Sequence, residues 1–274
     1  MQNVTNPEVE AALLAEVERL GLAALGVALD GRARERFAAY LALLLEWNER
    51  AGLTTVTDPV EVVRRHFGES LALLAVLRRA VLLPAGARVI DVGSGAGLPG
   101  LPMAILDGTL RVTLLESHGR RARFLQLAVE ALALENASVV QARAEDAGRN
   151  PELREAFDVA VARAVAPLAV LVELTLPLVR AGGLLATPKG ERAAAELLDA
   201  APAIEALGGR AEPPLALPVR DGVPPQTVLV VRRVGALDAR YPRRPGVPTR
   251  RPLGQPAGAR VIRSTSLPPD KDAE

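Results

Sequence analysis

The chain has 274 residues, of which 49% are hydrophobic and 24% charged, and its formal net charge is +1. This size and composition allow one large buried core, or a medium core with a small one, and they exclude a chain that is disordered throughout. The absence of cysteine excludes disulfides, thiolate metal sites and cysteine nucleophiles. With His66 and His118 as the only imidazoles, we expect no metal site.

The sequence shows no targeting or membrane-spanning pattern. The most apolar stretch, Ala164 to Val179, is interrupted by Pro167, Glu173 and Pro177, and no basic run precedes an apolar signal region. We therefore expect a cytoplasmic protein that does not contact a membrane, and we take a monomer as its expected state.

The first part of the chain is predicted to be helical, over Pro7 to Leu20, Asp30 to about Arg50, and Pro59 to about Leu83. In the second segment Asp30 can cap the N-terminus. Apolar residues recur there at helical spacing and define one buried face: Phe37, Tyr40, Leu41, Leu44 and Leu45. Residues 1–83 are thus expected to form an N-terminal helical region.

After Pro84-Ala-Gly86, short apolar segments alternate with helical ones, which is typical of βαβ units and a parallel sheet. The predicted strands are Arg88–Val92, Arg111–Glu116, Ser138–Ala142, Phe157–Ala162, Gly183–Thr187 and Thr227–Arg232. A helix containing Leu178 is expected to stop at Gly182-Gly183 and to lead into the fifth strand. Residues 84–235 therefore predict an α/β domain in which ligands bind at the carboxyl ends of the strands.

The first of these strands runs into a glycine-rich turn, over residues 89–100. Three glycines let the backbone approach a ligand closely and adopt positive φ: Gly93, Gly95 and Gly97. A nucleotide-like cofactor is implied. Leu98 stands where the dinucleotide pattern G-x-G-x-x-G requires glycine, and Asp91 would repel a pyrophosphate but attract a cationic amino-acid group. The turn therefore favours S-adenosylmethionine over NAD.

Acidic residues follow the next two strands. Glu116 ends the second strand, where its carboxylate can accept hydrogen bonds from the ribose hydroxyls of an adenosine, or can cap the following helix. Ala144, Glu145 and Asp146 follow the third strand. There an acidic side chain or a backbone amide can recognise adenine, with helix capping by Asp146 as the alternative.

Two basic residues follow the fourth and fifth strands and are positioning candidates for the reaction. Arg163 leaves a buried strand, so it should face either a ligand or a carboxylate. Lys189 is one of two lysines in the chain, and we expect it on the same rim, holding a phosphate or simply solvated.

Residue types that the chain lacks limit which base atoms it could methylate. Methylation at pyrimidine C5 requires a cysteine nucleophile, which the chain lacks. Methylation of an exocyclic base amine uses an Asn/Asp-Pro-Pro-aromatic tetrad, and neither Pro213-Pro214 nor Pro224-Pro225 has such flanks. A ring nitrogen with a free lone pair, such as guanine N7, needs only in-line placement against a methyl donor.

Taken together, these segments resemble the RsmG (GidB) family, which methylates guanine N7 in 16S ribosomal RNA. The resemblance rests on Trp47-Asn48, Leu53-Thr54, Asp91 to Gly100, Ala142-Arg-Ala-Glu145, Ala162-Arg-Ala-Val165, Leu176-Pro-Leu-Val, Lys189-Gly190 and Tyr241-Pro-Arg-Arg-Pro-Gly246. It implies a Rossmann-like class I methyltransferase domain with a mostly parallel seven-stranded sheet, behind an N-terminal helical segment.

The resemblance also implies roles for single residues. Contacts to S-adenosylmethionine are expected from Gly93, Leu98, Glu116, Ser117, His118, Ala144, Glu145 and Arg163. The RNA of the small ribosomal subunit is expected at Arg120, Arg121, Arg123, Lys189, Arg192, Arg243, Arg244, Arg250 and Arg251. Residues 236–274 are expected to form a basic tail, and removing the chain from Arg240 onward should weaken RNA binding while leaving cofactor binding intact.

Three other interpretations remain open from the sequence. The chain could be a class I methyltransferase for a small molecule or a protein, a nicotinamide-dependent dehydrogenase, or an RNA-binding module without activity. The basic rim argues against the first, Asp91 and Leu98 against the second, and the polar residues at successive strand ends against the third.

Overall fold

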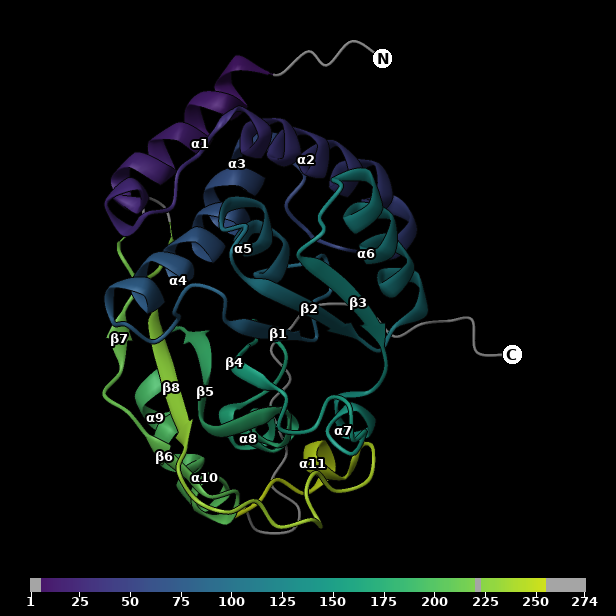
Figure 1. Cartoon of the computed structure of the whole chain (residues 1–274), viewed down its shortest axis with the longest axis vertical. Helices are drawn as coiled ribbons and strands as arrows, with labels where there is room; N and C mark the ends of the chain where they lie inside the picture. The colour runs from purple at the N-terminus through teal and green to yellow at the C-terminus, as the bar shows by residue number, and fades with distance from the viewer. Residues whose placement is uncertain (1–5, 220–222, 255–274) are drawn as a thin grey trace.

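The computed structural model of this protein describes residues 6–219 and 223–254, and these form an α/β structure around one mixed sheet (Figure 1). The order of the strands is β3-β2-β1-β4-β5-β8-β6, and β7 also pairs with β8. The strands are β1 (Arg88–Val92), β2 (Arg111–Glu116), β3 (Ala137–Gln141), β4 (Phe157–Val161), β5 (Val179–Lys189), β6 (Gly209–Ala211), β7 (Leu215–Ala216) and β8 (Thr227–Arg233).

Five neighbouring strands are parallel, namely β3, β2, β1, β4 and β5, whereas β8 runs antiparallel to β5, β6 and β7. The expected mostly parallel sheet is confirmed. The sheet has eight strands in the described part of the chain, one more than expected. The stretch 209–216 divides into β6 and β7, which are too short for a clear alternation pattern and pair with different parts of β8.

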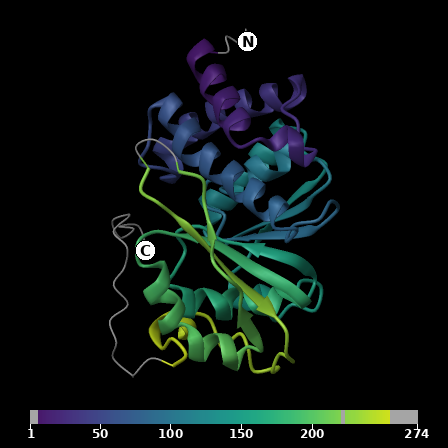
Figure 2. The same ribbon diagram turned by 90° about the vertical axis from the view of Figure 1, so that its left-hand side faces the viewer.

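Helices cover both faces of the sheet, so that the molecule has three layers (Figure 2). One layer holds α1 (Pro7–Arg19), η1 (Leu22–Leu25), α2 (Gly31–Ala51), α3 (Pro59–Glu61), η2 (Val62–Phe67), α4 (Gly68–Arg79), α5 (Gly100–Leu106) and α6 (Gly119–Ala131). The other holds α7 (Ala144–Ala147), α8 (Leu168–Thr175), η3 (Leu176–Leu178), α9 (Ala193–Asp199), α10 (Ala201–Ala206) and α11 (Val247–Arg250).

Each layer shares a hydrophobic core with one face of the sheet. Because side chains alternate along a strand, Val89 packs with the N-terminal helices and α5, whereas its neighbour Ile90 packs with α8 on the opposite face. The N-terminal helical region therefore shares its core with the sheet.

The N-terminal helices largely follow the sequence prediction. Asp30 caps α2, its Oδ1 accepting a hydrogen bond from Ala33 N at 2.7 Å. The third predicted helix differs from the structure in two ways. It contains a π-helical turn, η2, and it ends at Arg79 rather than Leu83, because Val81 has a φ of +57° that ends the helical path.

The prediction that a helix stops at Gly182-Gly183 is wrong. Helical structure ends at Leu178, and both glycines lie inside β5. The pairing of β4 with β5 shifts register between Phe157 and Val159, and a Cβ on Gly183 would lie 2.6 Å from the carbonyl oxygen of Asp158. Glycine is therefore needed here for the close approach of two strands.

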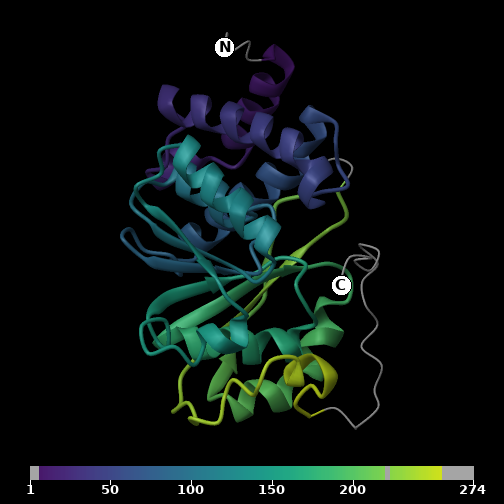
Figure 3. The same ribbon diagram turned by 90° about the vertical axis from the view of Figure 1, so that its right-hand side faces the viewer.

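The described part of the predicted tail crosses α7 and α8 in the layer opposite to the N-terminal helices (Figure 3). We call residues 238–251 the C-terminal strap. Arg149 Nε donates to Pro242 O at 2.9 Å, and Arg154 Nη1 donates to Tyr241 O at 2.7 Å. The strap is thus attached to the loop that follows α7.

In the described ranges, no helix is sufficiently long and apolar to span a membrane.

Candidate functional site

The glycine turn after β1 lies where the strand order reverses between β2 and β4. Gly93, Gly95 and Gly97 all have positive φ, of +74°, +56° and +91°. A Cβ at Gly97 would overlap Leu101, so that position also requires the missing side chain. At Gly95 a Cβ would approach no atom closer than 3.9 Å. Backbone conformation alone therefore explains Gly95, which leaves open space beside the turn.

Asp91, at the end of β1, is completely buried. Its Oδ2 accepts a hydrogen bond from Gly100 N at 2.9 Å, whereas its buried Oδ1 has no hydrogen-bond partner among the described residues. Burial raises the pKa of the Asp91 carboxyl to about 7, against the opposing effects of the Gly100 bond and the Arg163 charge. A buried oxygen without a partner is an available acceptor for a cationic ligand.

Glu116, at the end of β2, is also buried and holds the glycine turn in place. Its Oε2 accepts from Gly95 N at 2.9 Å, and its Oε1 accepts from His118 N at 2.7 Å. The carboxylate thus joins the turn to the start of α6. Each oxygen can accept further hydrogen bonds, so these contacts are compatible with the predicted role toward ribose.

Glu145 lies in α7, which follows β3 beside the end of β2, where Ala142 N donates to Glu116 O at 3.2 Å. Its carboxylate is 2% exposed. The Glu145 Oε1 atom accepts a hydrogen bond from Gly246 N of the strap at 2.8 Å. Asp146 does not cap α7, since the N-cap is Arg143 and makes no side-chain capping bond.

Arg163, after β4, faces a carboxylate, one of the two partners that its burial predicted. Its Nη1 lies 3.6 Å from Glu69 Oε2 of α4, and the two side chains are 15% and 12% exposed. Burial is the main cause of both the raised pKa of Asp91 and the lowered pKa of His66; the positive charge of Arg163 opposes the first shift and adds to the second. Arg163 is therefore close to both the turn and the N-terminal helices.

The N-terminal helices complete this side of the site. Tyr40 is completely buried in α2, and its hydroxyl donates to Ala96 O in the glycine turn at 2.6 Å. Tyr40 and Glu69 were not among the predicted site residues. The sequence marks Tyr40 only as a core position of an amphipathic helix.

Lys189 is not a free cation on the rim. Its Nζ lies 2.8 Å from Glu196 Oε2 and donates to Ala166 O, also at 2.8 Å. The same Glu196 oxygen accepts from Leu168 N at 2.9 Å. Lys189 and Glu196 thus hold the loop after β4, whose Val165 side chain covers Gly93.

Two arginines predicted at the RNA surface have internal partners. Arg243 bonds to the buried carboxylate of Glu173, and Arg121 Nη2 donates to Gly52 O at 3.4 Å. Six others are exposed, and no ion pair holds them within the described ranges: Arg120, Arg123, Arg192, Arg244, Arg250 and Arg251. Ser117 and His118 are also exposed, beside Glu116. Val247, Arg250 and Arg251 line a basic hollow of about 320 Å³.

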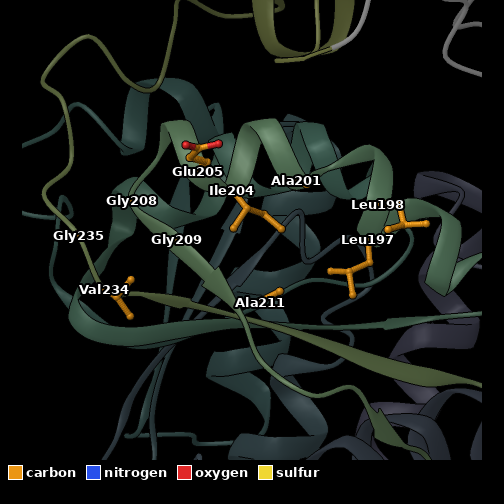
Figure 4. A pocket seen from close by; sticks show the side chains of 10 residues that line it. All are labelled: Leu197, Leu198, Ala201, Ile204, Glu205, Gly208, Gly209, Ala211, Val234 and Gly235. Carbon is orange, nitrogen blue, oxygen red and sulfur yellow. The ribbon is translucent and has the colours of Figure 1, made fainter.

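A larger groove, of about 430 Å³, lies at the far edge of the sheet, between α9, α10 and β6 (Figure 4). Leu197, Leu198, Ile204 and Val234 line it, and Glu205 is the only charged side chain among the described residues of its lining. Three strands, β4, β5 and β8, separate β6 from β1 in the sheet. The groove therefore lies outside the site at the glycine turn and lacks its polar groups.

The residues at the turn fit S-adenosylmethionine. The turn has open backbone at Gly95, an unpaired acid oxygen on Asp91, and two further buried carboxylates, Glu116 and Glu145. These match a cofactor with an ammonium group, ribose hydroxyls and an adenine. The described residues hold no group of three or more His, Asp or Glu side chains arranged for a metal ion.

Solved structures similar to this one share its fold. A crystal structure of an MtNAS variant in complex with S-adenosylmethionine superposes with a TM-score of 0.51 at 16% identity, covering 71% of this chain and 73% of that one. Another MtNAS crystal structure, with MTA and tNA, gives a TM-score of 0.50 at 17% identity, covering 71% of each chain.

Sequence relatives are much closer. The Ribosomal RNA small subunit methyltransferase G of Roseiflexus sp. strain RS-1 is 47% identical over 83% of this chain and 95% of its own length. The enzyme of the same name from Pelotomaculum thermopropionicum is 40% identical over 88% of this chain and all of its own. The model of the GidB family, described as rRNA small subunit methyltransferase G, matches residues 33–213, and the chain belongs to this family.

Proposed function

We propose that this protein transfers the methyl group of S-adenosylmethionine to N7 of a guanine in 16S ribosomal RNA. One observation carries the proposal: three neighbouring strands, β1, β2 and β3, each end in or lead to a buried carboxylate (Asp91, Glu116 and Glu145 of α7), on the side of the sheet that holds the glycine turn. The relatives named Ribosomal RNA small subunit methyltransferase G support the choice of substrate.

Each part of the cofactor has a matching group in the chain. The unpaired Asp91 Oδ1 would accept a hydrogen bond from the cofactor's ammonium group, and the Glu116 carboxylate would accept hydrogen bonds from the ribose hydroxyls. Ala144 and Glu145 would recognise adenine through a backbone amide and a carboxylate. Leu98, which is buried, closes the apolar side of the turn.

S-adenosylmethionine supplies an electrophilic methyl group, and guanine N7 has a free lone pair that can receive it without prior loss of a proton. The chain therefore needs to orient the base and exclude water, and no general base is required. Arg163, paired with Glu69, is a cation whose charge acts on Asp91, and it is the positioning residue for the base. His66 is uncharged at neutral pH, because burial lowers its pKa to about 4.

The RNA binds to the exposed arginines of α6 and of the strap.

A ribosomal substrate requires a cytoplasmic protein. The groups that match the cofactor all come from one copy of the chain, which supports a monomer. Neither a metal ion nor a membrane takes part in the reaction.

The direct test is transfer of labelled methyl from S-adenosylmethionine to small ribosomal subunits that lack the modification. We expect label at one guanine, mapped by chain cleavage specific for N7-methylguanine. Absence of label in both subunits and free ribosomal RNA, with cofactor binding intact, would instead favour a small-molecule or protein substrate.

Replacing Arg163 tests its positioning role. We expect Arg163→Ala to abolish methyl transfer and also to destabilise the protein by roughly 1–3 kcal/mol, because the largely buried Glu69 carboxylate loses the compensating charge of Arg163. The double variant Arg163→Ala with Glu69→Gln should recover most of the stability in urea denaturation and remain inactive. Recovery of activity in the double variant would show that Arg163 is needed only for folding.

The raised pKa of Asp91 predicts a pH dependence of cofactor binding. Since the ammonium binds the ionised carboxylate and the pKa is about 7, affinity should rise about tenfold between pH 6 and pH 8, with a proton released on binding. Calorimetric titration with S-adenosylhomocysteine, which carries the same ammonium, measures both effects. Asp91→Asn keeps an acceptor for Gly100, and it should bind more weakly and show no such rise. The same rise in the variant would assign the titration to another group.

The exposed strap arginines predict the salt dependence of RNA binding. Replacing Arg244, Arg250 and Arg251 together by glutamine should weaken binding and reduce the slope of log affinity against log salt by about two. Arg111→Gln is the matched control, because this exposed arginine begins β2 at the opposite end of the strand from the site. An equal change in the control variant would indicate a general charge effect.

A further inference from the structure

The C-terminal strap is anchored by a buried ion pair. Glu173 in α8 has no exposed surface, and Arg243 satisfies its carboxylate. Arg243 Nε lies 2.8 Å from Oε1 and 3.1 Å from Oε2, Nη2 lies 2.6 Å from Oε2, and the backbone N–H of Arg243 donates to Oε1 at 2.8 Å. A buried carboxylate needs such partners, so the position of the strap at Arg243 is fixed.

Three residues later the strap reaches the candidate cofactor site. Gly246 has a φ of +78°, which favours glycine, and its N–H donates to Glu145 Oε1 at 2.8 Å. No hydrogen bond to the second oxygen, Oε2, occurs among the described residues. Arg143 Nη2 also lies 3.6 Å from Oε1, so the strap and Arg143 together orient the Glu145 carboxylate, and both of these contacts leave Oε2 for a ligand.

The strap residues that precede Arg243 are also bound, by hydrogen bonds from the segment that follows α7. Arg149 and Arg154, which follow α7, donate to the carbonyls of Pro242 and Tyr241. A Cβ on Gly148 would lie 2.9 Å from Pro242 Cγ, so strap and loop are in close contact. The helix that carries Ala144 and Glu145 is thus held by the strap from both ends.

We propose that the C-terminal strap is a positioning element of the cofactor site, with Gly246 orienting Glu145 and the Arg243–Glu173 pair holding Gly246 in place. This inference rests on the proposed binding of S-adenosylmethionine. It gives Arg243 a role in cofactor binding instead of the RNA contact expected from the sequence. It also reverses one sequence-based expectation: removing the chain from Arg240 onward should impair cofactor binding as well as RNA binding.

The test measures binding of S-adenosylhomocysteine by calorimetry, with no need for turnover. Arg243→Ala combined with Glu173→Gln removes the anchor without leaving a buried charge unpaired. We expect its dissociation constant to rise about tenfold, since the loss of one oriented charged hydrogen bond has an effect of this order. Arg111→Ala, which changes an exposed arginine at the opposite end of β2 from the site, is the control and should bind like the wild type.

A double-mutant cycle separates positioning from a general loss of structure. If the anchor acts through Glu145, removing it in a Glu145→Gln background should change the dissociation constant less than twofold. A conservative Arg243→Lys variant should recover part of the affinity. Equal tenfold effects in both backgrounds would overturn the proposal.

Hydrogen exchange on the wild type covers the case in which the anchor variant fails to fold. Because coupling between two sites is reciprocal, S-adenosylhomocysteine should slow amide exchange in the strap as well as in the glycine turn. Protection of the turn alone, or unchanged binding in a folded anchor variant, would overturn the role of the strap. Failure of the wild type to bind the ligand would instead overturn the proposed function.

Discussion

Three carboxylates must be buried at one edge of the sheet, and much of the structure follows from this requirement. A buried carboxylate is stable only when hydrogen-bond donors surround it. Asp91 takes its donor from the start of α5, Glu116 takes donors from the glycine turn and from His118, and Glu145 takes one from the strap. The turn, two helix starts and the C-terminal segment are thereby brought to the same place.

The sequence predicts those parts of the site that depend on residues close together in the chain. A glycine turn after an apolar strand, and an acid at the end of the next strand, depend on residues that are neighbours in the chain. The parallel sheet then brings Asp91, Glu116 and Glu145 to one edge, as the βαβ pattern indicates. Asp30 likewise caps α2 because an N-cap acts within one helical turn.

The errors concern residues whose partners are distant in the chain or absent from the local pattern. Arg243 is a basic residue in a basic segment, and nothing nearby shows that Glu173, 70 residues earlier, is buried without another partner. Lys189 is rare in this chain, which made it a candidate for function, yet Glu196 holds it. Gly183 allows two strands to approach each other closely. Glycine is also the usual residue at the end of a helix, so the sequence alone does not distinguish the two roles.

The central claim is that the cofactor binds at the glycine turn between Asp91, Glu116 and Glu145. The most direct measurement is an NMR titration of glycine-labelled protein with S-adenosylhomocysteine, because glycines mark both the turn and the alternative groove at β6. Our account predicts shifts in the amide signals of Gly93, Gly95, Gly97 and Gly246, with Gly208, Gly209 and Gly235 unchanged. Shifts confined to the groove glycines would contradict it.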